Sequence, residues 1–168
     1  MGYVHDTHMS LFIPCTAMLP ITGTWTEAAG AVAGTICKHK AAAAETATVH
    51  IPIPLPSNAS ADKGSLLKAI EVDYEVKVAA CTSVTATLRK ITRGADGAVA
   101  VVSAPTITQD LAAATDAADV DQHKLTVTLT TPAYIDNDEE YKLEIAFVAA
   151  ATTTLDVLGA VANYTARM

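Results

Sequence analysis

The chain has 168 residues and carries 11 basic against 18 acidic residues, a net charge of -7. This size suits one domain, and the absence of a basic cluster argues against a nucleic-acid partner. Hydrophobic residues make up 51% of the chain but aromatic residues only 5%, because it holds 33 alanines and 23 threonines. We therefore expect a close-packed core of small side chains.

No membrane partner is expected either. The longest uncharged run, residues 9–26, contains two prolines and a glycine and is too broken to span a bilayer. No signal peptide is recognised at the start of the chain. Cys15, Cys37 and Cys81 show no CxxC spacing, so we expect buried thiols that pack as small hydrophobic side chains.

The first 26 residues show no clear hydrophobic period. Their prolines and Trp25 predict an extended N-terminal arm, with residues 27–168 forming a single domain; a first strand of the same sheet is an equally supported alternative. Residues 27–48 are rich in alanine and glycine and are expected to form strand and loop. Pro52 and Pro54 remove backbone donors, so residues 49–55 should lie at a sheet edge or where a strand leaves its sheet.

The clearest strand covers residues 67–78. Apolar and charged residues alternate there, which predicts a strand buried on one face and solvated on the other. The apolar positions are Ile70, Val72, Tyr74, Val76 and Val78, and the charged ones are Glu71, Asp73, Glu75 and Lys77. We expect residues 84–88 to be its hairpin partner and residues 94–97 to form the next turn.

Further strands are predicted along the rest of the chain. Residues 98–108, 125–129 and 141–148 have β-character, whereas residues 111–118 fit either a short helix or a solvated loop. Residues 152–165 have apolar side chains at both odd and even positions, which predicts a central strand covered on both faces or a strand against a partner chain. The fold class is therefore all-β, an antiparallel β-sandwich of jelly-roll type.

Motifs for catalysis and metal binding are weak. The sequence has no GxSxG, HExxH or glycine-rich phosphate loop, and His5 and His8 beside Asp6 are too few ligands for a metal site. The acidic run at residues 136–140 lacks the glycine position and terminal glutamate of an EF-hand calcium loop, so a solvated turn is predicted. We expect no enzyme activity, no cofactor and no metal.

The strand sequences resemble those of a known class of proteins. Residues 51–164 resemble the β-sandwich capsid decoration and fibre proteins of tailed bacteriophages. The segments are Ile70-Glu-Val-Asp-Tyr74, Val84-Thr-Ala-Thr-Leu88, Leu125-Thr-Val-Thr-Leu129 and Tyr141-Lys-Leu-Glu-Ile145. The resemblance implies a homotrimer located at the surface of a virion capsid.

The functional hypothesis is a non-enzymatic virion structural protein of the capsid decoration type. Its expected partners are its own copies and the major capsid protein lattice or other virion proteins. The alternative is a carbohydrate- or receptor-binding module, which the scarcity of aromatic residues disfavours. The residues expected at the interface are apolar ones from the arm and the last strand: Phe12, Ile13, Leu19, Trp25, Leu155, Leu158, Val161 and Tyr164.

Overall fold

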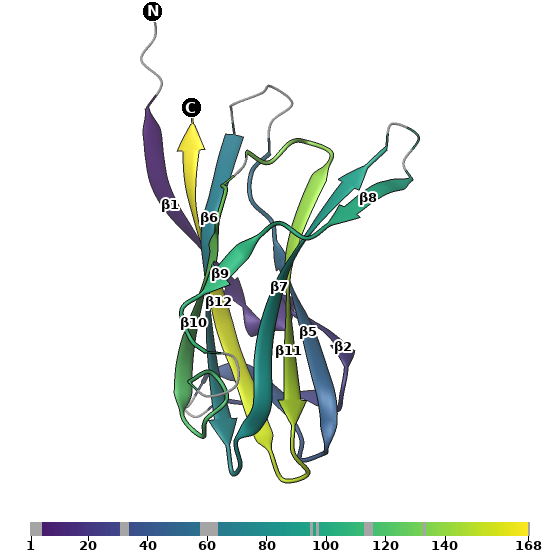
Figure 1. Cartoon of the computed structure of the whole chain (residues 1–168). Helices are drawn as coiled ribbons and strands as arrows, with labels where there is room; N and C mark the ends of the chain where they lie inside the picture. Colours follow the sequence, from purple (N-terminus) through teal and green to yellow (C-terminus); the bar gives the residue numbers. More distant parts are fainter. Residues whose placement is uncertain are drawn as a thin grey trace, which may run out of the picture.

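Two β-sheets pack face to face and form a sandwich (Figure 1). This computed structural model describes residues 5–30, 34–57, 64–94, 96, 98–112, 116–132 and 134–167. Every strand pairing within these residues is antiparallel, which confirms the predicted all-β sandwich. No helix in this part of the chain has the length and apolar character that crossing a bilayer requires.

The seven-stranded sheet has the order β3-β4-β12-β6-β10-β9, and β1 pairs with β12 beside β4. The bounds of its strands are β1 Asp6–Pro14, β3 Trp25–Ala29, β4 Ile36–Lys40, β6 Gly64–Lys77, β9 Ile107–Gln109, β10 Gln122–Leu129 and β12 Thr154–Arg167.

The five-stranded sheet has the order β2-β5-β11-β7-β8. Its strands are β2 Leu19–Thr22, β5 Glu45–Ile53, β7 Cys81–Arg93, β8 Val99–Ser103 and β11 Glu139–Ala149, and the short 3-10 turn η1, Cys15–Ala17, leads from β1 towards β2.

Strand β6 confirms the predicted alternation. From Ile70 to Lys77 its apolar side chains are buried in the core, and its charged side chains lie on the outer face of the seven-stranded sheet. Val78 is the exception, because the strand ends at Lys77 and Val78 adopts a left-handed turn conformation with φ of 67°. Its side chain is 74% exposed, so its predicted place in the core was wrong.

The predicted hairpin between residues 67–78 and 84–88 was also wrong. Strand β6 pairs with β10 and β12, whereas β7 pairs with β11 and β8 in the other sheet. The short link at residues 78–80 therefore crosses from one sheet to the other. Strand β7 forms its hairpin with β8, and the Gly94 amide donates a hydrogen bond to the Ala98 carbonyl (2.7 Å). Of the predicted turn at residues 94–97, residues 95 and 97 lie outside the described part of the chain.

Residues 6–26 lie within the sandwich. They form β1, which pairs with β12, β2, which pairs with β5, and the first residues of β3. Ile13, Cys15 and Met18 are buried in the common core, so a domain limited to residues 27–168 would lack part of that core. The edge predicted for residues 49–55 applies only to their second half: β2 begins opposite His50, so Val49 and His50 are paired on both sides, whereas Pro52 has only β11 as its described neighbour and β5 ends at Ile53, before Pro54.

The loop at residues 110–121 closes one end of the sandwich. Its described residues form bends and turns, which agrees with the loop rather than the helix, and residues 113–115 lie outside the description. Ala117 and Ala118 are buried, and the Tyr74 hydroxyl donates a hydrogen bond of 2.6 Å to the Ala117 carbonyl. All three cysteines are buried and free, as predicted.

Candidate functional site

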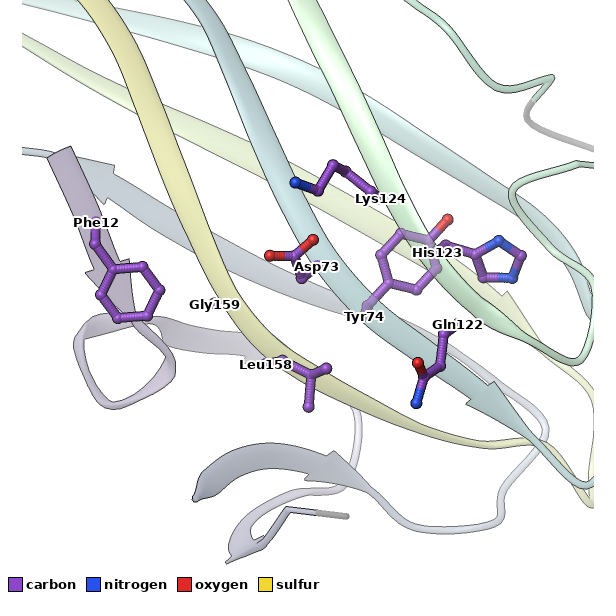
Figure 2. Close-up of a pocket in the computed structure, with 8 residues that line it drawn as sticks. All are labelled: Phe12, Asp73, Tyr74, Gln122, His123, Lys124, Leu158 and Gly159. Carbon is purple, nitrogen blue, oxygen red and sulfur yellow. The ribbon is translucent and has the colours of Figure 1, made fainter. Parts of the chain in front are cut away.

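A groove with a volume of about 460 Å³ lies on the outer face of the seven-stranded sheet. Figure 2 shows Phe12 on one side of it, the side chains of β10 on the other, and Asp73 between them. Its volume falls within the range typical of small-molecule sites. The lining residues are Phe12, Asp73, Tyr74, Gln122, His123, Lys124, Leu158 and Gly159.

The aromatic side of the groove is built by β1 and β12. Because side chains alternate along β1, Ile13 points into the core and Phe12 points outward, where it is 63% exposed. The Phe12 ring lies against the backbone of Gly159: a Cβ atom added there would be 2.9 Å from Phe12 Cε2. The glycine therefore leaves room for the Cε2–Cζ edge of the ring beside the strand.

A β-bulge in β12 creates this arrangement. The register to β6 shifts between Val157 and Gly159, so Leu158 is an extra residue on the outer face. Val157 before the bulge and Ala160 after it both face the core. The bulge thus largely explains why this segment has apolar residues at both odd and even positions, and a second covered face is not needed to explain them.

The polar side of the groove is built by β6 and β10. Cross-strand pairing places Gly159 opposite Asp73, and Asp73 opposite Lys124. Lys124 Nζ donates a hydrogen bond to Glu71 Oε2 (3.2 Å). This bond, followed by the negative charges of Asp73 and Glu71, raises the pKa of Lys124.

Next to the groove, Asp156 is the centre of a polar network on the same face. Its carboxylate is 3% exposed and accepts hydrogen bonds from His39 Nδ1 (2.6 Å) and Lys77 Nζ (2.5 Å). Burial raises its pKa, but these two hydrogen bonds outweigh burial and the net pKa is lowered. Lys77 also lies 3.3 Å from Glu75 Oε2. The network joins β4, β12 and β6.

Cys37 lies close enough to this network for the charge of Asp156 to affect its pKa. Burial and that negative charge raise the pKa of the thiol to about 11. A cysteine nucleophile requires the thiolate, so the Cys37 thiol is protonated and unreactive at neutral pH. The constellation of Cys37, His39 and Asp156 therefore holds strands together and lacks an activated nucleophile.

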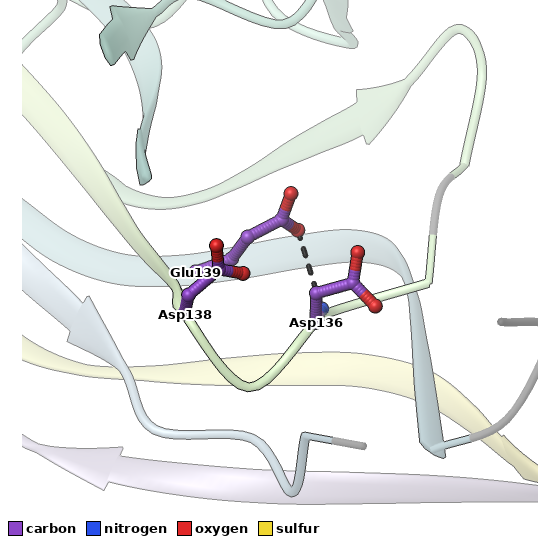
Figure 3. Close-up of side chains that lie close together, drawn as sticks. All are labelled: Asp136, Asp138 and Glu139. Carbon is purple, nitrogen blue, oxygen red and sulfur yellow. Dashed lines mark hydrogen bonds between the residues drawn. The ribbon is translucent and has the colours of Figure 1, made fainter. Parts of the chain in front are cut away.

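A second cluster of polar groups is the acidic turn before β11 (Figure 3). One carboxylate oxygen from each of Asp136, Asp138 and Glu139 lies within 4.8 Å of the other two. The Asp136 amide donates a hydrogen bond to Glu139 Oε2 (3.3 Å), and Glu139 forms an ion pair with Lys90. Asp136 and Asp138 are exposed, so a solvated turn accounts for the arrangement.

The structure places the predicted interface residues in two environments. Ile13, Leu155 and Tyr164 are buried in the core, which corrects the prediction for these three, because the alternation and the bulge orient them inward. The other five reach the surface to different degrees. Phe12 and Leu19 are exposed, whereas Trp25, Leu158 and Val161 are half-buried.

Two features of this face were not predicted from the sequence. Asp73 and Lys124 belong to separate strands, and nothing in the sequence predicted their pairing across β6 and β10. Asp156 had a usable signal, since it is a lone charge within an apolar stretch and such a residue requires partners when buried.

Comparison with known proteins gives little further guidance. No protein family matches the sequence, and no curated protein matches it. Among solved structures, the chain is similar to the catalytic domain of a GH87 alpha-1,3-glucanase (D1045A) in complex with nigerose, with a TM-score of 0.39 and 11% sequence identity. The match covers 95% of this chain and 28% of that one, so the chain spans under a third of the glucanase structure.

Proposed function

We propose that this protein is a non-enzymatic structural component of a virion, of the capsid decoration type, which assembles with its own copies and binds the capsid lattice. One observation supports this most directly. Among the described residues, every exposed large hydrophobic side chain other than valine lies between residues 9 and 36. These side chains are Met9, Phe12, Leu19, Ile21 and Ile36. Of these, Leu19 and Ile21 lie together on strand β2, and exposed apolar side chains at one surface mark an interaction region.

The strand β2 is the part of this region best suited to self-association. It is an edge strand of the five-stranded sheet, and all four of its residues are exposed. Leu19 is 58% exposed and Ile21 is 52% exposed. Because β2 is short, contains Pro20 and has a register shift between Pro20 and Thr22, its backbone is a poor template for another strand, and contact between copies would be made by the Leu19 and Ile21 side chains. We expect copies to meet here and to form a trimer, as the resemblance to phage decoration proteins implies.

Light scattering on the full chain at micromolar concentration tests the assembly. We expect a trimer for the wild type and a monomer for L19S/I21S, whose substituted side chains are exposed and should leave the fold intact. The matched control V102S/V120S replaces two exposed valines outside residues 9–36 and should remain a trimer. A monomeric wild-type protein would contradict the proposal.

The virion role has a separate test. Genes for capsid or tail proteins should lie beside the gene for this chain. Purified trimer should also co-sediment with capsids assembled from the neighbouring major capsid protein, and L19S/I21S should lose most of that binding, since trimeric binding multiplies weak contacts. An unrelated gene neighbourhood together with no co-sedimentation would remove the virion part of the proposal.

A further inference from the structure

We propose that the groove on the outer face of the seven-stranded sheet binds a neutral saccharide, with a sugar ring packed on the Phe12 side chain. This activity is additional to the assembly role. It uses the outer face of the other sheet, not strand β2.

Phe12 offers the apolar contact for a sugar ring. Its ring lies beside Gly159 with the Cε2–Cζ edge nearest to the position of an added Cβ, and 63% of the residue remains exposed at the edge of the groove. An exposed aromatic ring is a stacking platform for a flat apolar surface. A pyranose ring has such a surface, because its axial C–H groups line one face while its hydroxyl groups project around the rim.

The polar side chains of β6 and β10 offer contacts for the hydroxyl groups of the sugar. Asp73 and Lys124 follow Gly159 on successive strands, so their backbones are about 5 Å and 10 Å from it. A carboxylate accepts hydrogen bonds, whereas an ammonium group and the Gln122 amide donate them. Within the described residues, neither the Asp73 carboxylate nor the Gln122 side-chain amide is hydrogen-bonded to the protein. Vicinal hydroxyl groups, each a donor and an acceptor, complement this mixture.

The negative charge of this face favours a neutral ligand. Asp73 and Glu71 place two carboxylates on this face, and Lys124 is already bound to Glu71. An anionic ligand would meet this negative charge, whereas a neutral saccharide would not. The groove is open, so the ligand would bury a small area. We expect a Kd on the order of 0.1–1 mM for one saccharide chain, and a trimer with three such sites would bind a glycan surface more tightly.

The test uses the full chain on an array of neutral gluco-, galacto-, manno- and N-acetylglucosamine oligosaccharides, with sialylated glycans for comparison. The neutral oligosaccharide with the strongest binding signal on the array is then titrated into the protein by calorimetry. We expect F12A to weaken binding more than tenfold and D73A to weaken it at least threefold. V148A, which truncates an exposed side chain on β11 of the other sheet, should bind like the wild type.

Circular dichroism and light scattering on F12A and D73A establish that fold and assembly persist. Binding to none of the neutral glycans would overturn the proposal, and so would a glycan whose affinity F12A leaves unchanged. Preference for sialylated glycans would overturn the assignment of a neutral ligand. None of these outcomes bears on assembly, because L19S/I21S tests assembly at a different surface and should keep the groove functional.

Discussion

Replacing Lys40 by methionine should weaken the fold more than any surface substitution, because this lysine is 0% exposed. Its Nζ donates hydrogen bonds to the carbonyl oxygens of Ala41 (2.8 Å) and Ala43 (3.0 Å) in the turn after β4. It also donates to the Thr153 carbonyl (3.4 Å) and lies 3.5 Å from Glu45 Oε1. The ammonium group therefore ties the β4–β5 turn to the residue just before β12.

The expected loss in the free energy of unfolding depends on the polar groups that lose their hydrogen-bond partner in K40M. Removing one partner of a buried charge network costs about 3–5 kcal/mol, chiefly because polar groups remain buried without partners. Here Ala41 and Ala43 are only half-buried and the Glu45 side chain keeps 25% exposure, whereas Thr153 is buried. We therefore expect the free energy of unfolding to fall by about 3 kcal/mol, at the lower end of that range. For a chain of this size the melting temperature should fall by roughly 6–12 °C.

Urea denaturation followed by circular dichroism measures this difference. The matched control is K142M, because Lys142 is half-buried on the outer face of β11, and it should change the unfolding free energy by less than about 0.5 kcal/mol. If K40M lies within about 0.5 kcal/mol of the wild type, the carbonyl cage does not hold the turn and the reasoning is refuted.

Two further predictions follow from buried groups whose pKa values are shifted, the Asp156 carboxylate and the three cysteine thiols. Since the pKa of Asp156 is below its ordinary value of 3.8, the carboxylate stabilises the fold above that pH, and the contribution is lost as pH falls through the lower folded-state pKa. D156N should therefore lower the free energy of unfolding at neutral pH and make it fall less steeply as the pH is lowered. Urea titrations at several pH values measure both effects. If the free energy of unfolding of D156N falls in acid as steeply as that of the wild type, the prediction is contradicted. Burial raises the pKa of the Cys15, Cys37 and Cys81 thiols, so Ellman's reagent at neutral pH should label the native chain far more slowly than the urea-unfolded chain, and equal rates would show that the thiols are accessible.

The strands that could be predicted from the sequence are those with one buried and one solvated face. In β6, Val72 and Tyr74 alternate with Asp73 and Glu75, and the same logic holds for β10 and β11. Periodicity identifies the face of a side chain but not the neighbour of its strand. For this reason the pairing of β6 with β12, from the other end of the chain, could not be predicted, and adjacent segments were paired instead.

Strand β12 shows how a β-bulge can make a prediction based on hydrophobic alternation wrong. Leu155 and Val157 occupy odd positions and face the core, but the extra residue Leu158 moves the core-facing set to the even positions of Ala160 and Ala162. In the sequence, this change appears as apolar residues at both odd and even positions. A glycine directly after the change of parity was the available signal, because glycine within a strand often marks a bulge.

The groove depends on that same irregularity, which is why its residues looked unrelated in the sequence. Phe12 was interpreted as a contact residue of an arm, and Asp73 as ordinary solvated surface. The bulge gives Leu158 a place on the outer face and leaves Gly159 opposite Asp73, with no side chain between them. Any larger residue at position 159 would meet the Phe12 ring at 2.9 Å. The aromatic platform and the polar residues of β6 and β10 thus share one face because β12 breaks its alternation at this point.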